Sequence, residues 1–198
     1  MGMTKGRYAA WLARHGQTAW SLAGKHTGRS DIPLTPEGEE EARKLGARLQ
    51  KSSFATVLTS PLQRARKTCE LAGFGATAEP VPDLMEWNYG DYDGLTSAEI
   101  RAKRPDWHLF RDGCPGGEQL GDVMARVDRV IARIQSSPGD VLVFSHGHLL
   151  RVLATRWAGI PPELGGHFSL APASLSILGT DHASGDPVLE RWNDVCHL

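Results

Sequence analysis

The chain of 198 residues is long enough for one sizeable hydrophobic core, and its formal net charge of −1 excludes a global positive field that would attract nucleic acid. Its three cysteines form no CxxC pair, which argues against a disulfide framework or a zinc site and favours a reducing, cytoplasmic location. No apolar run is long enough to span a membrane, and no secretory signal is evident. We therefore expect one domain over residues 1–198 with neither nucleic acid nor membrane as partner. Evidence on oligomeric state is weak, and a homodimer stays open.

The first predicted strand, residues 8–12, leads directly into Arg14, His15 and Gly16. Neighbouring side chains of a strand point to opposite faces, so Arg14 and His15 reach one ligand only if the chain turns here. Gly16 permits such a turn because it has no Cβ. Open α/β sheets bind ligands at the carboxyl ends of their strands, and an imidazole beside a fixed positive charge suits attack on an anionic phosphorus centre. For so short a motif, the alternative that His15 merely caps a loop stays open.

Predicted strands and helices alternate along the rest of the chain. Further strands are expected at residues 54–59, 79–84, 141–144, 175–178 and 188–192, the second of these interrupted by Pro80 and Pro82. Helices are expected from Pro36 with Thr35 as N-cap, and over residues 60–71, 97–104, 120–134 and 149–158. Residues 21–33 and 107–117 are expected loops, the second of which would cover the site. The pattern predicts a three-layer α/β/α domain with a mainly parallel sheet.

A second predicted strand also ends in a histidine followed by a glycine. The continuous apolar run of residues 141–144 is typical of a central parallel strand, and Ser145, His146 and Gly147 follow it. If the two strands are adjacent, His15 and His146 lie close together. Arg64 falls in the first turn of a predicted helix at the same sheet edge, where backbone N–H groups and a guanidinium together make an anion site. The alternative for Arg64 alone is a surface arginine with a solvated head.

Four ordered blocks of the chain resemble the histidine phosphatase superfamily, the clan of cofactor-dependent phosphoglycerate mutases and histidine acid phosphatases. The blocks are residues 14–18, residues 60–68, Glu86 and residues 145–147, and the resemblance covers nearly the whole chain. It implies a phosphoglycerate mutase-like α/β fold and a phosphohistidine at His15, without a cofactor or a metal. Arg14 and Arg64 would bind phosphate oxygens with their planar forks, and His146, if protonated, would add a third donor.

The resemblance also selects Glu86, rather than Asp91 or Asp93, as the acid that protonates the leaving alcohol and then deprotonates water. It implies substrate contacts at six further positions, namely Gln17, Ser21, Thr27, Gly28, Tyr89 and Gly147. The expected activity is that of a phosphomonoesterase acting on small phosphorylated metabolites such as sugar phosphates.

Within the family, departures from the mutase pattern favour hydrolysis over phosphoglycerate mutase activity, which is kept as the alternative. Ser21 stands where mutases usually have asparagine, and Ser97 where they have a carboxylate-binding lysine. The stretch from Glu86 to His146 lacks the insertion that carries a paired arginine in mutases. Residues 20–21, 26–28, 86–92 and 112–114 look closest to acid phosphatases and sedoheptulose-bisphosphatase-like members.

Two alternatives lie outside this chemistry. A metal-dependent hydrolase would use His15, His146 and Asp31 as ligands, but Arg14 and Arg64 would repel a cation from the same pocket. A non-catalytic module that binds a phosphorylated ligand would need the anion pocket but no acid at Glu86. No Walker loop, HExxH or GxSxG motif is present to suggest another mechanism.

Overall fold

The computed structural model describes residues 8–198, which form one six-stranded sheet; residues 1–7 lie outside the described part. The strand order is β3-β2-β4-β1-β5-β6. The strands are β1 (Ala10–Arg14), β2 (Thr56–Thr59), β3 (Ala78–Pro80), β4 (Val141–Ser145), β5 (Leu175–Thr180) and β6 (Pro187–Asp194). The first four pair in parallel, whereas β5 is antiparallel to β1 and β6 to β5, which confirms the mainly parallel sheet.

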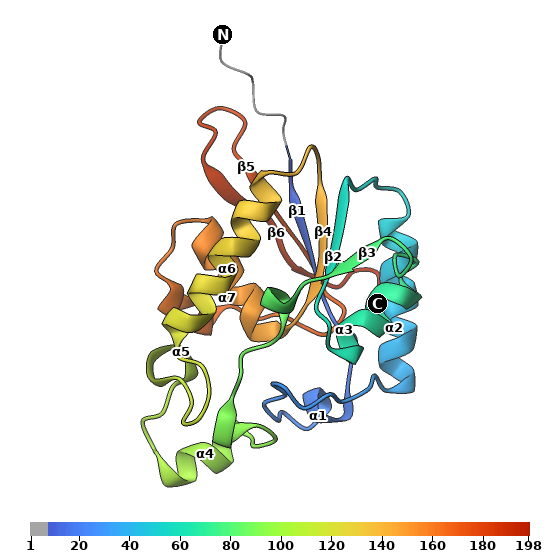
Figure 1. Ribbon diagram of the computed structural model, residues 1–198. Helices are drawn as coiled ribbons and strands as arrows, with labels where there is room; N and C mark the ends of the chain where they lie inside the picture. Colours follow the sequence, from blue (N-terminus) through green and yellow to red (C-terminus); the bar gives the residue numbers. More distant parts are fainter. Residues whose placement is uncertain (1–7) are drawn as a thin grey trace.

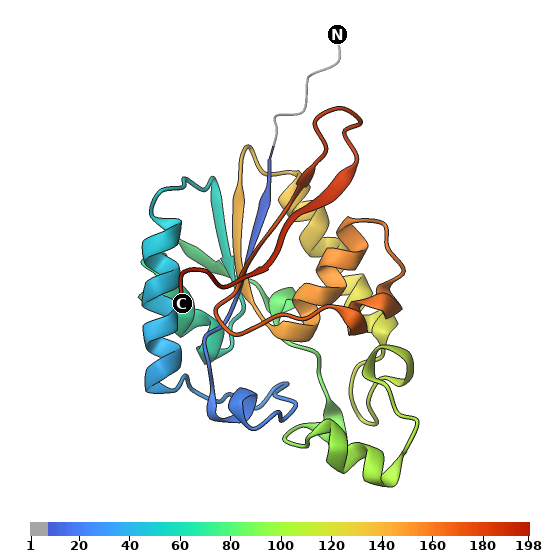
Figure 2. The same cartoon turned by 180° about the vertical axis from the view of Figure 1, so that it is seen from behind.

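Helices cover both faces of this sheet (Figures 1 and 2). On one face, α2 (Pro36–Leu49) and α3 (Gln63–Leu71) pack on Leu142 and Phe144 of β4. On the other, α6 (Leu120–Gln135) and α7 (Gly147–Trp157) pack on Val141 and Val143. Every residue of β4 is buried, because both faces of a central parallel strand are covered. The three-layer prediction is therefore confirmed.

Several helix boundaries follow the predicted capping residues. Thr35 caps α2 by accepting a hydrogen bond from the Gly38 N–H, and Pro36 occupies the first helical position. Thr96 and Glu99 form the expected capping box of α4 (Ser97–Lys103). Local capping chemistry thus sets these helix starts.

Other boundaries differ from the prediction. The strand expected at residues 79–84 ends at Pro80 and gives way to the 3-10 helix η1 (Pro82–Leu84), because prolines cannot donate to the ladder. The first strand begins at Ala10 rather than residue 8. The helix expected from residue 60 begins at Gln63, and the one expected from residue 149 begins at Gly147.

Two expected loops contain short helices. The first loop starts inside α1 (Ala19–Leu22), and the second contains α5 (Leu109–Asp112). The 3-10 helices η2 (Gly90–Tyr92) and η3 (Pro162–His167) complete the described helices. In the second loop, Trp107, Phe110 and Cys114 are buried, so this segment is a packed part of the domain.

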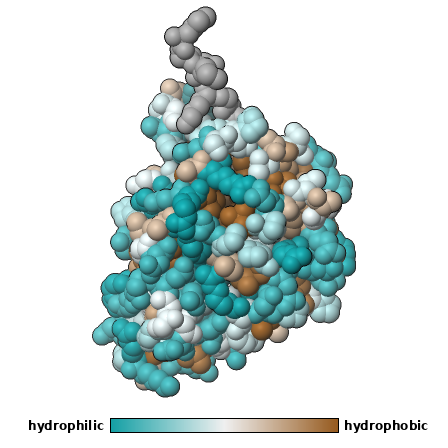
Figure 3. Space-filling model, in the orientation of Figure 1, coloured by the Kyte–Doolittle hydropathy of each residue, from teal (hydrophilic) through white to brown (hydrophobic). Residues whose placement is uncertain are grey.

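The carboxyl ends of three parallel strands meet at one edge of the sheet. Arg14 pairs with Ser145 across β1 and β4, and Thr59 pairs with Phe144 across β2 and β4. Helices α1 and α4 lie beyond this edge in both ribbon views (Figures 1 and 2). The face seen in Figure 3 is largely hydrophilic, with limited apolar areas between polar ones. Among residues 8–198, no helix combines the length and apolar character of a membrane span.

Candidate active site

The turn after β1 is held by close backbone packing. A Cβ on Gly16 would collide with the carbonyl oxygen of Gly38 in the first turn of α2, so only glycine fits there. The Gly16 N–H donates to Thr68 Oγ1 at 3.0 Å, and the His15 N–H donates to the Ser145 carbonyl at 3.0 Å. Contacts from α2, α3 and β4 therefore fix the position of His15.

The His15 imidazole has one defined proton position. Its Nδ1 lies 2.8 Å from the Gly16 carbonyl oxygen, which can only accept, so Nδ1 carries the proton and Nε2 keeps a lone pair. Burial, and secondarily the charges of Arg64 and Arg14, hold the pKa of His15 well below its ordinary value. The ring is therefore neutral and nucleophilic at Nε2.

His146 lies beside it, with the two ring centroids 5.2 Å apart, which bears out the expected adjacency. The Arg64 Nε–H donates to His146 Nδ1 at 3.2 Å, so the proton sits on Nε2 and is donated to Ser60 Oγ at 2.7 Å. Burial and the Arg64 charge hold the pKa of His146 well below its ordinary value. In this arrangement His146 is a neutral ring, not the protonated donor considered from the sequence.

Arg64 is 0% exposed, which excludes the surface-arginine alternative. Besides the bond to His146, its Nη1 donates to the Ser30 carbonyl at 3.0 Å, and its Nη2 donates to the carbonyls of Thr27 and Gly28 at 2.9 Å each. Because a guanidinium has five N–H groups, one on Nη1 is left for a ligand. Arg64 thus anchors residues 27–30 and does not present the free bidentate fork expected from the sequence.

Arg14, unlike Arg64, has an edge of its guanidinium that lacks a hydrogen-bond partner. Its Nη1 donates to the Leu170 carbonyl, whereas its Nε is buried and has no partner among the described residues. A Cβ on Gly147 would lie 3.4 Å from this Nε, so the glycine keeps the space beside the guanidinium open. A buried cationic edge without a partner is unfavourable unless an anion binds to it.

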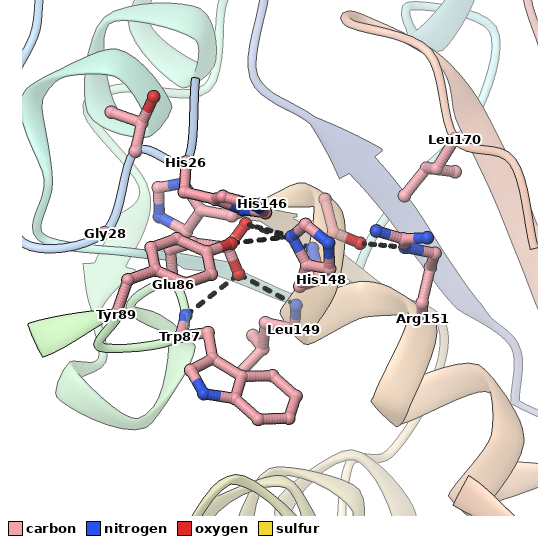
Figure 4. Close-up of polar contacts among 12 residues, drawn as sticks. His26, Gly28, Glu86, Trp87, Tyr89, His146, His148, Leu149, Arg151 and Leu170 are labelled. Atoms are coloured by element: carbon pink, nitrogen blue, oxygen red, sulfur yellow. Dashed lines mark hydrogen bonds and ion pairs between the residues drawn. The ribbon is translucent and has the colours of Figure 1, made fainter. Parts of the chain in front are cut away.

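Glu86 caps helix α7 from a distant part of the chain (Figure 4). Its Oε1 accepts from the N–H groups of Trp87 and Leu149 at 2.9 Å each, and its Oε2 accepts from the His148 N–H at 3.0 Å. The N-cap residue His146 makes no side-chain cap bond, so the carboxylate takes over that role. These three bonds fix the carboxylate within the cavity wall.

A cavity of about 270 Å³ joins most of the predicted site residues. Those that line it are Arg14, His15, Ser21, Thr27, Glu86, Tyr89 and Gly147. Arg64, His146, Gln17 and Gly28 do not line it. A larger groove of about 830 Å³ lies beside α3 but contains none of these residues, so the chemistry favours the smaller cavity.

Three predicted contact residues have local structural partners. The Gln17 side chain accepts a hydrogen bond from Thr35 Oγ1 at 2.9 Å, and the Ser21 hydroxyl donates to the Thr18 carbonyl at 3.0 Å. Gly28 is required by packing, because a Cβ there would lie 2.8 Å from the Trp87 carbonyl oxygen. Their substrate contacts stay predictions.

The sequence reasoning did not single out His26, His148 or Arg151, which also line the cavity. His148 Nδ1 is hydrogen-bonded to the Tyr89 hydroxyl at 2.6 Å, and Arg151 Nε donates to the Gly147 carbonyl at 3.2 Å. A signal was present for Arg151, since it follows Gly147 by four residues and so shares its helix face.

The three residues considered as metal ligands, His15, His146 and Asp31, do not form a metal site. Asp31 Oδ1 accepts from the Gln63 N–H at 2.8 Å and so caps the start of α3. Within residues 8–198, no cluster of three or more His, Cys, Asp or Glu side chains has a geometry suited to a metal ion.

Comparison with known proteins gives a consistent result. Residues 10–195 match the family model of the histidine phosphatase superfamily (branch 1). An acid phosphatase of Mycobacterium tuberculosis is 40% identical over 176 residues, which are 86% of each chain. Sedoheptulose 1,7-bisphosphatase of Saccharomyces cerevisiae is 37% identical over 181 residues, 75% of this chain and 67% of that protein.

Solved structures agree with the sequence relatives. The structure of an open reading frame product from Mycobacterium tuberculosis superposes with a TM-score of 0.85 at 36% identity, covering 94% of this chain and 99% of that one. Phosphoglycerate mutases also occur among the sequence relatives.

Proposed function

The chain belongs to the histidine phosphatase superfamily, and from this premise we propose that it hydrolyses small phosphomonoesters through a phosphohistidine at His15. The observation that carries the proposal is the unpaired, buried Nε of Arg14 beside a neutral imidazole whose Nε2 is free. A dianionic phosphoryl group would satisfy the arginine and bring phosphorus to the nucleophile.

The reaction would proceed in two displacements. His15 Nε2 attacks phosphorus while the P–O bond to the leaving alcohol breaks, and Glu86 gives its proton to the departing oxygen. Glu86 then takes a proton from water, whose oxygen attacks phosphorus as the P–N bond breaks. Oε2 suits this role, since it accepts one hydrogen bond from the backbone whereas Oε1 accepts two.

The remaining site residues would stabilise the transferring group and the leaving group. Arg14 would donate to the equatorial oxygens through its unpaired edge, and Arg64, which does not line the cavity, would add its positive charge close to His15. His146 would act by positioning Arg64, whose Nε it accepts from. Thr27, Tyr89 and Gly147 line the space left for the leaving group.

Hydrolysis is favoured over phosphoglycerate mutase activity by the residue at the mutase lysine position. Ser97 lines the cavity and its hydroxyl is hydrogen-bonded to His26 Nε2 at 3.1 Å, so it brings no charge to a substrate carboxylate. The named phosphatases among the relatives support a sugar phosphate or similar metabolite as substrate. The mutases among them keep mutase activity as the second candidate.

Metal independence and a cytoplasmic location belong to the same proposal. Arg14 and Arg64 supply the positive charge that a metal would otherwise bring. The three cysteines are free thiols, which suits a reducing compartment.

The proposal is tested by measuring phosphate release from sugar phosphates, phosphoglycerates, nucleotides and phosphopeptides, with and without EDTA. We expect release from small phosphomonoesters, unchanged by EDTA and lost in His15→Ala. With bisphosphoglycerate present, interconversion of phosphoglycerates that outruns hydrolysis would establish the mutase instead. Binding without any release would establish the non-catalytic module.

A further inference from the structure

Arg151 is a half-buried cation that forms no ion pair with a carboxylate of residues 8–198, although Glu86 acts on it electrostatically across the cavity. Its Nε and Nη1 donate to backbone carbonyls, those of Gly147 at 3.2 Å and Phe168 at 3.1 Å, and no carboxylate among the described residues forms an ion pair with it. By contrast, Arg156 on the same helix forms an exposed pair with Asp128 at 2.8 Å. An inward-facing arginine without a carboxylate indicates a position for an external anion.

Arg151 lies next to the phosphate-binding arginine. Arg14 Nη1 donates to the Leu170 carbonyl and Arg151 Nη1 to the Phe168 carbonyl, two residues earlier. The two acceptor carbonyls lie at most about 7 Å apart along the chain. The two guanidinium groups are close enough to interact, because the charge of Arg151 contributes to lowering the pKa of Arg14, after burial. Gly147 contacts both, since its carbonyl accepts from Arg151 and a Cβ on it would lie 3.4 Å from the Arg14 guanidinium carbon. Figure 4 shows Arg151 near His148 and Leu170.

The surroundings of Arg151 suit an anion. It lines both the main cavity and an adjoining cavity of about 150 Å³. Glu86 is the one acidic residue among the described residues that line either cavity. The Phe110 ring lies 5.3 Å from the Arg151 guanidinium carbon and restrains its plane.

The charge balance of the proposed reaction leaves Arg151 uncompensated. In the proposed reaction Glu86 acts as the acid toward the leaving group, so the mechanism does not assign it the role of counter-charge to Arg151. A phosphate dianion then offsets Arg14 and Arg64, and the charge of Arg151 remains.

We propose that Arg151 binds a second anionic group of the substrate, carboxylate or phosphate, while Arg14 holds the phosphoryl group that is transferred. This inference rests on the proposed phosphatase function and deepens it to a substrate class. The substrate is a small phosphomonoester whose second anion lies within a few bonds of the reacting phosphate. Ser97 of α4 supplies no positive charge for this second anion, and Arg151 of α7 supplies it instead.

The test compares matched substrates that differ only in the second group. One pair is 3-phosphoglycerate and glycerol 3-phosphate, and the other is fructose 1,6-bisphosphate and fructose 6-phosphate; p-nitrophenyl phosphate reports basal chemistry. In the wild-type enzyme, kcat/KM should favour the doubly anionic member of at least one pair by tenfold or more. The favoured pair identifies carboxylate or phosphate as the second anion.

Arg151→Met should remove this preference, lowering kcat/KM for the favoured substrate roughly tenfold to hundredfold, the loss typical of a charged hydrogen bond. p-Nitrophenyl phosphate should change less than about threefold, and Arg151→Lys should retain part of the preference. The control Arg156→Met removes a cation from the same helix and should leave the preference intact.

Three outcomes separate the claims. A wild-type ratio near one in both pairs, measured without any variant, overturns the inference. Equal losses on all substrates in a folded Arg151→Met enzyme also overturn it, because Arg151 would then be structural. Failure of wild-type enzyme to hydrolyse even p-nitrophenyl phosphate would instead refute the phosphatase function itself.

Discussion

At the scale of single residues, the proposed reaction requires a neutral His15 with its proton on Nδ1. The Gly16 carbonyl fixes that proton, and burial lowers the pKa of the ring well below its ordinary value. We expect the histidine ring signals of His15, followed by NMR in phosphate-free buffer, to show no protonation until the pH is well under 6.5. Titration of His15 near 6.5, as in an unfolded chain, would contradict the assigned environment.

The sequence predicted the identities of these residues better than their hydrogen bonds. His15, Arg14 and Glu86 follow from motifs, because strand ends and family blocks are local in sequence. The engagement of Arg64 with the carbonyls of residues 27–30 was not predictable, since it depends on how a long loop returns to α3. The position of Arg151 was not predictable for a related reason, because the absence of an ion pair to it within residues 8–198 depends on how its neighbours pack.

At the scale of elements, Glu86 caps α7 and is also the general acid of the proposed reaction. Glu86→Gln places an amide N–H against the His148 or Leu149 N–H, so one cap bond is lost. We expect a loss of about 1–3 kcal/mol in the free energy of unfolding, measured by urea denaturation. We also expect a hundredfold to ten-thousandfold loss of hydrolysis for substrates with poor leaving groups.

The leaving group distinguishes the two roles of Glu86. An alkoxide needs the proton and nitrophenolate needs it much less, so single-turnover phosphorylation by p-nitrophenyl phosphate should suffer less than that by a sugar phosphate. Equal losses for both substrates would make Glu86 a purely structural cap, and the general acid would then be sought elsewhere.

The first turn of α2 packs closely against the turn that follows His15. A Cβ on Gly38 would collide with the Gln17 carbonyl oxygen, so Gly38→Ala must push α2 away from the turn. We expect a loss of about 1–3 kcal/mol in stability together with reduced kcat. Gly121→Ala is the control, because a Cβ there meets no atom within 4 Å and alanine favours the helix by about 0.5–1 kcal/mol. Unchanged thermal stability and activity in Gly38→Ala would show that the turn tolerates the displacement.

At the scale of the whole molecule, three buried histidines and the half-buried His148 make stability depend on pH. The pKa values of His15, His146 and His148 are held well below normal and that of His26 is lowered to about 4, in each case mainly by burial. Below pH 6.5 the unfolded chain therefore binds more protons than the folded one. Their contribution is full above about pH 6.5 and is lost as the pH falls toward the folded pKa values.

His26 gives this prediction a magnitude. One histidine costs at most about 1.4 kcal/mol per pH unit, so His26 alone accounts for about 3 kcal/mol between pH 6.5 and 4. Urea denaturation at pH 7, 6 and 5 should show falling stability, and His26→Gln should reduce the slope. Stability that is flat from pH 7 to 5 would contradict the buried neutral state of these rings.

The layer architecture followed from the sequence because it depends on periodicity. The apolar run of β4 and the stripe of α6 predicted a central strand and a covering helix, and both occur. The strand predicted at residues 79–84 ends at Pro80, and the loop predicted at residues 107–117 contains the short helix α5. Both segments contain proline or glycine pairs whose conformation is decided by tertiary packing. Residues 107–110 also line the cavity that adjoins the site, so the substrate is less predictable from sequence than the chemistry.

The central claim is that phosphate passes through His15. Enzyme mixed with a phosphomonoester, quenched at alkaline pH within one turnover and digested, should yield one phosphorylated peptide by mass spectrometry, with the phosphate on His15. The phosphoenzyme should form and decay as fast as turnover, and His15→Ala should show neither label nor activity. Full turnover without phosphate on His15, or with phosphate on His146 instead, would contradict the account.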